Sequence, residues 1–269
     1  MKKKILPLLS VIAVGIFLAV NCLSTTTEGG LVGADRNQLM LVPANTIELS
    51  AKQSYQQVLS EAKAAGKLNR NATVTKRVIS IAQKLINETS AFRPDAVNWD
   101  WQVNVITDST VNAWCLPGGR IVVYTGIIDA LKLTDSELAA ILGHEISHAL
   151  REHSREQMSQ QVLTSLGTMA LARILDIDRS GVELVNICSE LMLTLPFSRS
   201  HETEADNIGT ELMARAGYDP YDAVNVWKKM SALSKNNPPE VLSTHPSNAS
   251  RINNLNVTAE KVYPLYKKR

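Results

Sequence analysis

Cysteine, aromatic residues and an excess of one charge are all scarce in this sequence of 269 residues. Three cysteines are too few to hold a domain of this size together by disulfides. Aromatic residues make up 5% of the chain and the formal net charge is +2. The sequence therefore lacks the basic surface and the stacking residues that nucleic-acid-binding proteins use, and we expect no nucleic acid among its partners.

Hydrophobic runs long enough to span a membrane are also absent beyond the first twenty residues. Lys2 to Lys4 precede an uncharged apolar run, residues 5–20, which is short for a spanning helix. This order is typical of a secretory signal. Cys22 follows and resembles the lipidated cysteine of a bacterial lipoprotein, although Ala19 and Asn21 depart from the usual residues there. An ordinary cleaved signal or an uncleaved anchor helix are the alternatives.

The rest of the chain is long enough to form one domain with a substantial core. Residues 22–45 are rich in Thr, Gly and Asn without periodicity, which predicts a flexible tether. We therefore expect a signal peptide at 1–21, a tether at 22–45 and a single domain at 46–269. The cysteines of that domain, Cys115 and Cys188, are either paired or two isolated buried thiols, and their spacing does not decide which.

Apolar periodicity predicts an α+β domain that is mostly helical around a small sheet. The helix that begins near Asp135 is marked by a capping box, Thr134 with Glu137. Turn residues 117–119 separate two expected strands, 101–107 and 120–125. Further helices are expected over residues 50–65, 71–88, 157–177, 182–195, 200–216 and 219–233.

The helix from Asp135 carries the motif His-Glu-x-x-His. His144 and His148 lie about 40° apart around a helix, so both imidazoles can bind one ion. Glu145 lies about 100° away, where it can take a proton from an attacking water. The helix is apolar, and two buried imidazoles need partners. These residues therefore predict a zinc site.

A third ligand is needed, and the nearby His153 does not supply it. It lies nine residues after His144, about half a turn away around the helix. The metzincin pattern would need Gly at position 151 and His at 154, where this chain has Arg151 and Ser154. We expect His153 to be a structural or capping residue whose charge suits the end of the helix.

The stretch SRSHETEADNIG, residues 198–209, offers carboxylates instead. Glu202 and Asp206 are one helical turn apart and share a face, so one could bind the metal while the other holds a ligand histidine. Glu204 lies about 200° from Glu202 and faces elsewhere. The alternative is an acidic helix start that is simply solvated.

Four motifs in order, NAWCLPGGRIVVYTG, HEISHALREH, SRSHETEAD and STHPSNASR, resemble the CAAX-prenyl-protease/HtpX-type zinc metallopeptidases. Within this gluzincin family the soluble periplasmic branch, that of BepA and LoiP, is the most similar. The resemblance covers residues 50–257 and implies a compact, mostly helical core with a short sheet beside the HExxH helix. It also implies one zinc ion per chain, held by His144, His148 and Glu202 with Asp206 in support.

The resemblance extends to two more stretches. Residues 112–119 resemble the motif that begins the edge strand of the family's cleft, where an extended peptide pairs through main-chain bonds. The substrate-binding residues implied are Asn112, Ala113, Gly119 and Ile121. His245 and Arg251 resemble a pair near the metal, where they would stabilise the oxyanion or where His245 would occupy the open zinc position. A loop histidine is the alternative for His245.

These inferences predict an exported zinc endopeptidase, periplasmic and tethered by lipid at Cys22 to a membrane, most naturally the outer one. Its catalytic residues would be Glu145, His245 and Arg251. By family analogy the substrates would be misfolded or misassembled envelope proteins. One alternative is a zinc-stabilised chaperone or assembly factor, which would not need Glu145. Another is a stress-activated inner-membrane protease of an organelle, for which the chain after residue 22 offers no clear spanning helix.

Overall fold

The computed structural model describes residues 23–165, 185–186, 188–189, 191–234, 240–245 and 249–267. The expected signal peptide and Cys22 lie outside these residues. So do large parts of the helices expected over 157–177 and 182–195.

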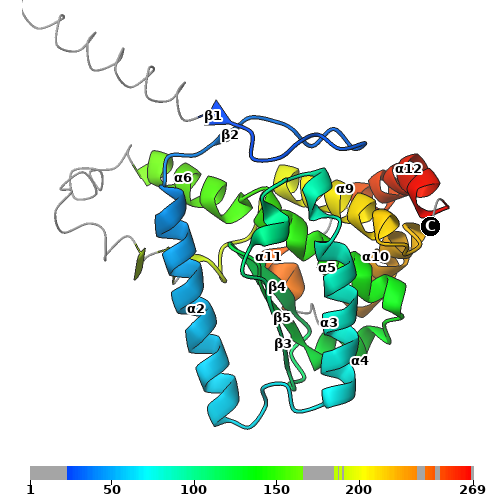
Figure 1. The fold of residues 1–269 in the computed structure, drawn as a ribbon, viewed down its shortest axis with the longest axis horizontal. Helices are drawn as coiled ribbons and strands as arrows, with labels where there is room; N and C mark the ends of the chain where they lie inside the picture. Colours follow the sequence, from blue (N-terminus) through cyan, green and yellow to red (C-terminus); the bar gives the residue numbers. More distant parts are fainter. Residues whose placement is uncertain are drawn as a thin grey trace, which may run out of the picture.

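The described chain is α+β and mostly helical, as the sequence predicts (Figure 1). Its sheet-forming part is short and precedes most of the helices. In chain order the elements are β1 (Leu23–Ser24), β2 (Gln38–Leu39), α2 (Ala44–Ala64), α3 (Ala72–Ile86), η1 (Thr89–Ala91), η2 (Ala96–Asn98), β3 (Gln102–Ile106), β4 (Ala113–Leu116), β5 (Arg120–Tyr124), α4 (Thr125–Leu131), α5 (Asp135–Leu150), α6 (His153–Ser165), α9 (Arg199–Arg215), α10 (Tyr221–Ser234), α11 (Val241–Thr244) and α12 (Ala249–Tyr266).

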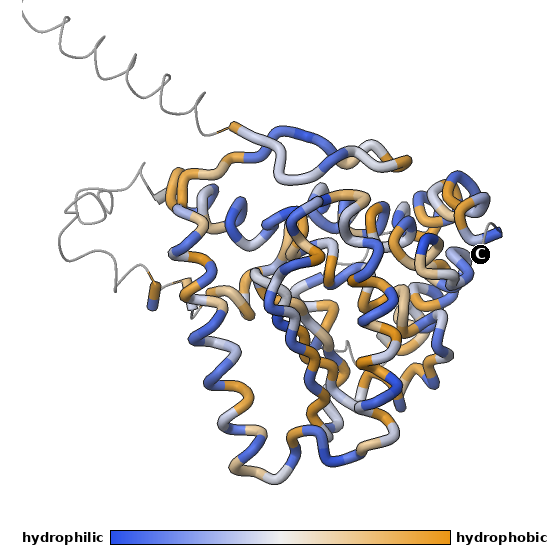
Figure 2. The backbone as a smooth tube through the Cα atoms, viewed as in Figure 1, coloured by the Kyte–Doolittle hydropathy of each residue, from blue (hydrophilic) through white to orange (hydrophobic). Residues whose placement is uncertain are grey.

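Strand β5 lies in the middle of a three-stranded sheet of order β3-β5-β4. It runs parallel to β3 and antiparallel to β4, so β4 forms one edge. The alternating pattern predicted β3 and β5 within one or two residues. It did not predict β4, because all four residues of that strand are buried and no alternation is visible. Figure 2 shows the hydrophobic character of these strands.

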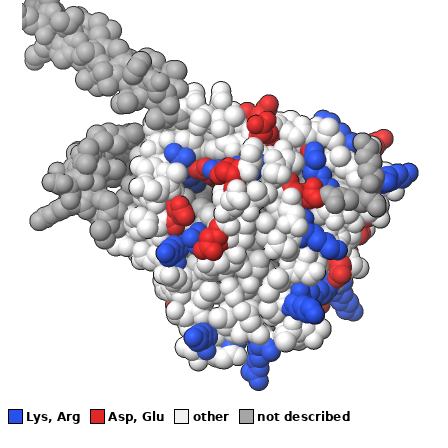
Figure 3. Space-filling model, in the orientation of Figure 1, with Lys and Arg blue, Asp and Glu red and all other residues white. Residues whose placement is uncertain are grey.

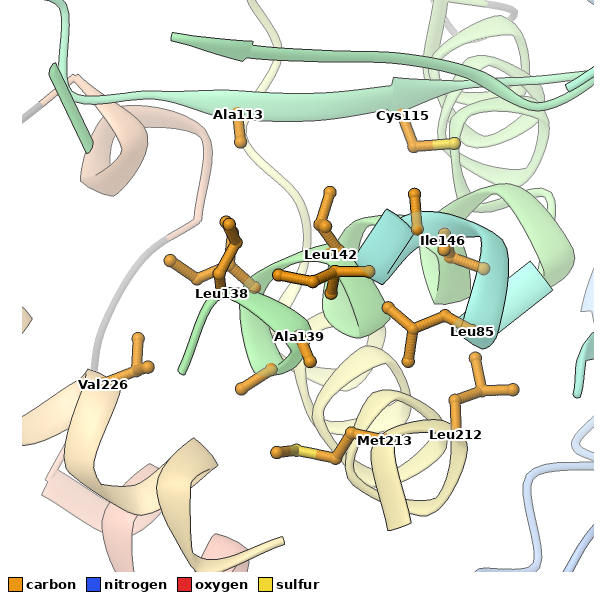
Figure 4. Packing of buried hydrophobic residues seen from close by; sticks show 14 of the residues in the cluster. Leu85, Ala113, Cys115, Leu138, Ala139, Leu142, Ile146, Leu212, Met213 and Val226 are labelled. Atoms are coloured by element: carbon orange, nitrogen blue, oxygen red, sulfur yellow. The ribbon is translucent and has the colours of Figure 1, made fainter. Parts of the chain in front are cut away.

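The motif helix α5 is buried from Glu137 to Leu150. The predicted capping box is confirmed: Thr134 Oγ1 accepts from the Glu137 amide, and Glu137 Oε2 accepts from the Thr134 amide. The apolar side of α5 packs beneath the sheet, and Figure 4 shows Ala113 and Cys115 of β4 pointing toward it. The helix is therefore fixed below the edge strand by its own apolar residues.

The structure differs from the flexible tether expected for residues 22–45. Residues 23–42, which we call the N-terminal segment, pair as β1–β2 and cross the domain above α6 and α9 (Figure 1). Gln38 is fully buried, and its amide donates to the Arg151 carbonyl and to Glu156, both at 2.7 Å. Polar contacts and a few separate apolar residues, among them Ala34 and Val42, hold this segment, and this mixture leaves no hydrophobic period in the sequence. Helix α2 also begins earlier than predicted, directly after Pro43.

The described cysteines are not paired: Cys115 and Cys188 are both free and buried. Within the described residues, no helix combines the length and the apolarity that crossing a membrane requires. Figure 3 shows acidic and basic side chains lying among one another on the face drawn, with wide uncharged areas between them.

Candidate metal centre

Helix α5 places both histidines of the motif in one buried cluster. His144 and His148 are 8% and 3% exposed, and their Nε2 atoms lie 3.1 Å apart. Glu145 is also buried, at 4% exposure. His144 and His148 are four positions apart on one helix. As the sequence predicts, this directs one nitrogen of each imidazole at the same point.

Two glycines bring the second helix, α9, close to α5. A Cβ atom on Gly209 would lie 2.6 Å from the His144 backbone nitrogen, and one on Gly143 would lie 2.8 Å from the Gly209 oxygen. Both distances are too short for any other residue, so the helices meet backbone to backbone. This close approach brings the carboxylates at the start of α9 next to the histidines. The sequence motifs did not predict that the two helices pack so closely.

Glu202 and His245 complete the cluster. Glu202 Oε1 lies 3.4 Å from His148 Nε2, and Glu202 Oε2 lies 3.6 Å from His144 Nε2. The C-cap residue of α11, His245, contributes Nδ1, which lies 3.0 Å from Glu202 and 3.3 Å from His144 Nε2. One ligand atom from each of the four residues lies within 4.8 Å of the others.

This donor set fits zinc. Zinc bonds of 2.0–2.1 Å in a tetrahedron place neighbouring ligand atoms roughly 3.3 Å apart. Neighbouring nitrogen and oxygen atoms of the four residues lie 3.0 to 3.6 Å apart. Imidazole nitrogen and carboxylate oxygen are ligands that zinc prefers. The predicted ligands His144, His148 and Glu202 could therefore hold one ion, with His245 at the fourth position.

Asp206 and Arg251 lie behind the ligands. Asp206 Oδ1 is 2.9 Å from His144 Nδ1, so it accepts that proton and leaves Nε2 free to face the cluster. Arg251 donates to both oxygens of Asp206, at 2.6 and 2.7 Å, and to Glu202 at 2.6 Å. Its guanidinium stacks 3.4 Å from the Trp227 ring. The structure thus makes Arg251 a clamp on two carboxylates. The oxyanion role that the resemblance implies for it stays a prediction.

Burial and the close charges shift several pKa values at this site. Burial raises the pKa of Glu145, a shift that His245 and His144 oppose. Burial alone would raise the pKa of Glu202 too, but His245 and His148 lower it below its ordinary value. Burial lowers the pKa of His148 well below 6.5. A buried carboxyl with a raised pKa beside anionic and neutral ligands is suited to general-base work.

His153 and Glu204 do not join the ligand cluster, as the sequence predicts, yet they lie next to it. His153 Nδ1 is 3.0 Å from His148 Nδ1, and His153 Nε2 is 3.1 Å from Glu204. The expected charge on His153 is wrong, because burial lowers its pKa to about 4 and leaves it neutral. It begins α6 and does not end α5. The contact between His153 and His148 cannot be predicted from helical periodicity, because the helix ends at Leu150 and Arg151 is its C-cap.

The edge strand β4 forms one wall of a cleft beside the cluster. Asn112 and Ala113 line this cleft together with Glu145, His148 and His245. Two other residues expected to bind substrate do not reach it. Ile121 is fully buried in the core on β5, whose two edges are both paired, and Gly119 lies in the turn against Trp101. The resemblance implied all four residues, which flank one turn, but the motif does not tell the edge strand from the central one.

A second, apolar hollow opens on the other side of Glu145. Its lining includes Ile141, Trp227 and Met230, together with His144 and His245. Helices α5 and α10 supply most of these side chains, and Figure 4 shows Val226 of α10 facing the same part of the core. The cluster therefore lies between a cleft along β4 and an apolar hollow.

Comparison with known proteins agrees with this geometry. Residues 72–259 match the model of Peptidase family M48. The mitochondrial metalloendopeptidase OMA1 of Arabidopsis thaliana is 42% identical over 151 residues, 56% of this chain and 30% of the relative. The human metalloendopeptidase OMA1, mitochondrial, is 30% identical over 82% of this chain and 44% of its own length.

A bacterial relative is also similar. The beta-barrel assembly-enhancing protease of Escherichia coli is 24% identical over 201 residues, 71% of this chain and 40% of the relative. The chain thus spans less than half the length of each of these three relatives. The chain is thus similar to both mitochondrial proteins and to the bacterial one, and its identity to the mitochondrial proteins is higher.

Proposed function

The chain belongs to peptidase family M48, and from that premise and the geometry of its site we propose that it is a zinc-dependent endopeptidase. One observation carries this proposal. His144, His148 and Glu202 converge on one point while Glu145 lies beside them with its carboxylate outside the ligand set. A protein that used zinc only for stability would have no need of this buried carboxyl.

The chemistry divides between the metal and the side chains. Bound zinc would supply a Lewis acid for the scissile carbonyl and would make water a nucleophile near neutral pH. Glu145 accepts the proton of the attacking water and delivers it to the leaving amine. Asp206 holds His144 in the tautomer that keeps Nε2 free, and Arg251 fixes both Asp206 and Glu202.

The cleft along β4 suggests how a substrate would be bound. An extended peptide lying beside an edge strand pairs through main-chain bonds, which makes the preference for side chains weak. The apolar hollow beside Glu145 would accept one hydrophobic side chain. Both features suit segments of unfolded protein, in which the backbone and the hydrophobic residues are exposed. Misfolded or misassembled proteins are therefore the substrate class that we propose.

Cleavage of an unfolded, casein-like protein by the purified chain tests this function. If the chain is an endopeptidase, the wild-type protein should cut casein into fragments and the Glu145→Gln variant should produce few fragments. The chaperone alternative predicts that the wild-type protein binds casein without cutting it. Binding of casein without cleavage would therefore contradict the endopeptidase and favour the chaperone or assembly factor.

The cellular location is part of the proposal. Lys2–Lys4, the apolar run and Cys22 support export, with a lipid on Cys22 as the anchor and the periplasm as the compartment. The envelope would then supply the misassembled substrates, as the name of the E. coli relative suggests. Mass spectrometry of the mature N-terminus tests this, because an unmodified or uncleaved N-terminus would contradict a lipoprotein.

His245 is expected to keep the site closed at rest. Its Nδ1 is within 3.0–3.3 Å of Glu202 and His144, and a fourth protein ligand would leave no position for water. His245→Ala should therefore raise basal cleavage of casein and self-cleavage, without loss of zinc. Rates of fragment release and zinc content measured on the same preparation check this.

A lower rate of cleavage by His245→Ala would indicate a catalytic role for the imidazole. If His245 stabilises the transition state, His245→Ala should lower kcat while zinc stays bound. No change in rate or in zinc affinity would make His245 a structural residue only. Thr244→Ala, which removes the neighbouring hydroxyl and leaves the imidazole in place, is the matched control and should behave as the wild type.

A further inference from the structure

A chain of buried polar contacts leads from the ligand His148 away from the cluster. His148 Nδ1 is 3.0 Å from His153 Nδ1, and His153 Nε2 is 3.1 Å from Glu204 Oε2. His153 is fully buried and stacks at 4.5 Å on His201, with Phe197 nearby. The ring is therefore held by aromatic contacts, with each nitrogen directed at a partner.

The geometry allows one distribution of protons along this chain. Nε2 of His148 faces Glu202 and His144 and must carry a lone pair to bind zinc, so its proton is on Nδ1. Nδ1 of His153 then accepts that proton, and the proton of His153 lies on Nε2. Glu204 accepts the latter. Each donor thus meets an acceptor, and His148 is fixed in the tautomer that binds metal.

Glu204 is itself held in place by two arginines. Arg151, fully buried, donates from Nε at 3.0 Å, and Arg36 donates from Nε at 2.5 Å. Arg151 also donates to the hydroxyls of Thr25 and Thr27, both at 3.1 Å. The N-terminal segment therefore closes the space behind Glu204, and the carboxylate is turned away from the metal cluster toward His153.

From these contacts we propose that His153 and Glu204 are positioning residues for the zinc ligand His148. This inference rests on the zinc site proposed above. The two ligand histidines are supported differently: His144 by the carboxylate of Asp206 directly, and His148 by a neutral imidazole that transmits the hold of Glu204. Outer-shell partners of this kind orient a ligand and raise its affinity for the metal.

A pair of amide substitutions separates positioning from packing. The side-chain amide of His153→Asn ends near the position of Nδ1 and keeps an acceptor for His148. The amide of His153→Gln ends near the position of Nε2, so it keeps the bond to Glu204 and lacks that acceptor. Zinc affinity is measured by competition with a chelator of known affinity, on metal-free protein reloaded with zinc, and thermal unfolding of the metal-free protein is followed in parallel.

We expect His153→Gln to weaken zinc binding about 10–100-fold. His153→Asn keeps the acceptor for His148 and loses the bond to Glu204, so it should weaken zinc binding only severalfold. His201→Gln is the matched control: it changes the other ring of the stack, keeps a donor toward Glu156, and should bind zinc as the wild type does. Equal zinc affinity of His153→Gln and the wild type would overturn the inference, as would equal weakening by the Asn and Gln variants.

Two further outcomes are distinguished by the same assay. A wild-type protein that does not bind zinc would overturn the proposed function itself, whereas an unaffected His153→Gln would overturn this inference alone. If both His153 variants fail to fold, Glu204→Asp withdraws the carboxylate from His153 by one methylene. It should weaken zinc binding severalfold, and wild-type affinity in that variant would contradict the positioning role.

Discussion

Glu145→Gln should lose most proteolysis, on the order of 10²-fold or more, and keep its zinc. Glutamine has the shape of glutamate but cannot accept the proton of an attacking water. Zinc should stay bound because the Glu145 carboxylate is outside the four-residue ligand cluster. Casein cleavage and zinc content measured on the same protein check both halves of this expectation.

A glutamate far from the site supplies the control for that change. Glu61 on α2 is exposed, so Glu61→Gln should leave cleavage and zinc as they are. Cleavage by Glu145→Gln at the wild-type rate would show that another group is the base. Loss of zinc in the same variant would mean that Glu145 helps to bind the metal, contrary to its position in the cluster.

Glu202→Ala should lose zinc and activity together. Glu202 is the one carboxylate in the ligand cluster and lies within 3.4–3.6 Å of both histidines of the motif. Removing it takes away a ligand, so the loss of zinc affinity should exceed the roughly 10–100-fold loss typical of an outer-shell partner. Metal analysis and chelator competition measure this directly.

The neighbouring residue on α9 provides the comparison. Thr203 donates its hydroxyl to the Arg199 carbonyl, so Thr203→Ala alters the same turn without touching the cluster. It should retain zinc. Full zinc in Glu202→Ala would refute the choice of third ligand. Glu204 would be an unsuitable replacement, since its carboxylate is occupied by Arg151, Arg36 and His153.

The parts of the site that the sequence predicted are those governed by local periodicity. His144 and His148 share a face because they are four residues apart, and Glu202 and Asp206 do so for the same reason. The capping box fixed the start of α5 to within a residue. In each case a single helix determines the outcome, so a single stretch of sequence was sufficient.

The parts that it did not predict depend on contacts between distant segments. Only the resemblance put His245 near the metal; periodicity could not, because His245 and Glu202 are 43 residues apart and meet where α11 ends beside the cluster. Arg251 became a clamp because its donors meet two carboxylates on α9. The resemblance implied Ile121 for the cleft, whereas the structure places it on the central strand β5; the order of strands in a sheet cannot be read from the alternation of one strand. The N-terminal segment docks through polar side chains and a few separate apolar ones, which together produce no hydrophobic period.

Removal and restoration of zinc are the most direct test of whether the chain is a zinc endopeptidase. The purified protein is incubated with casein before chelation, after exhaustive chelation, and after one equivalent of zinc is returned. A zinc endopeptidase should give fragments in the first sample, almost none in the second, and restored cleavage in the third, together with one bound zinc per chain. Cleavage that continues undiminished after the metal has been removed would contradict the zinc endopeptidase altogether.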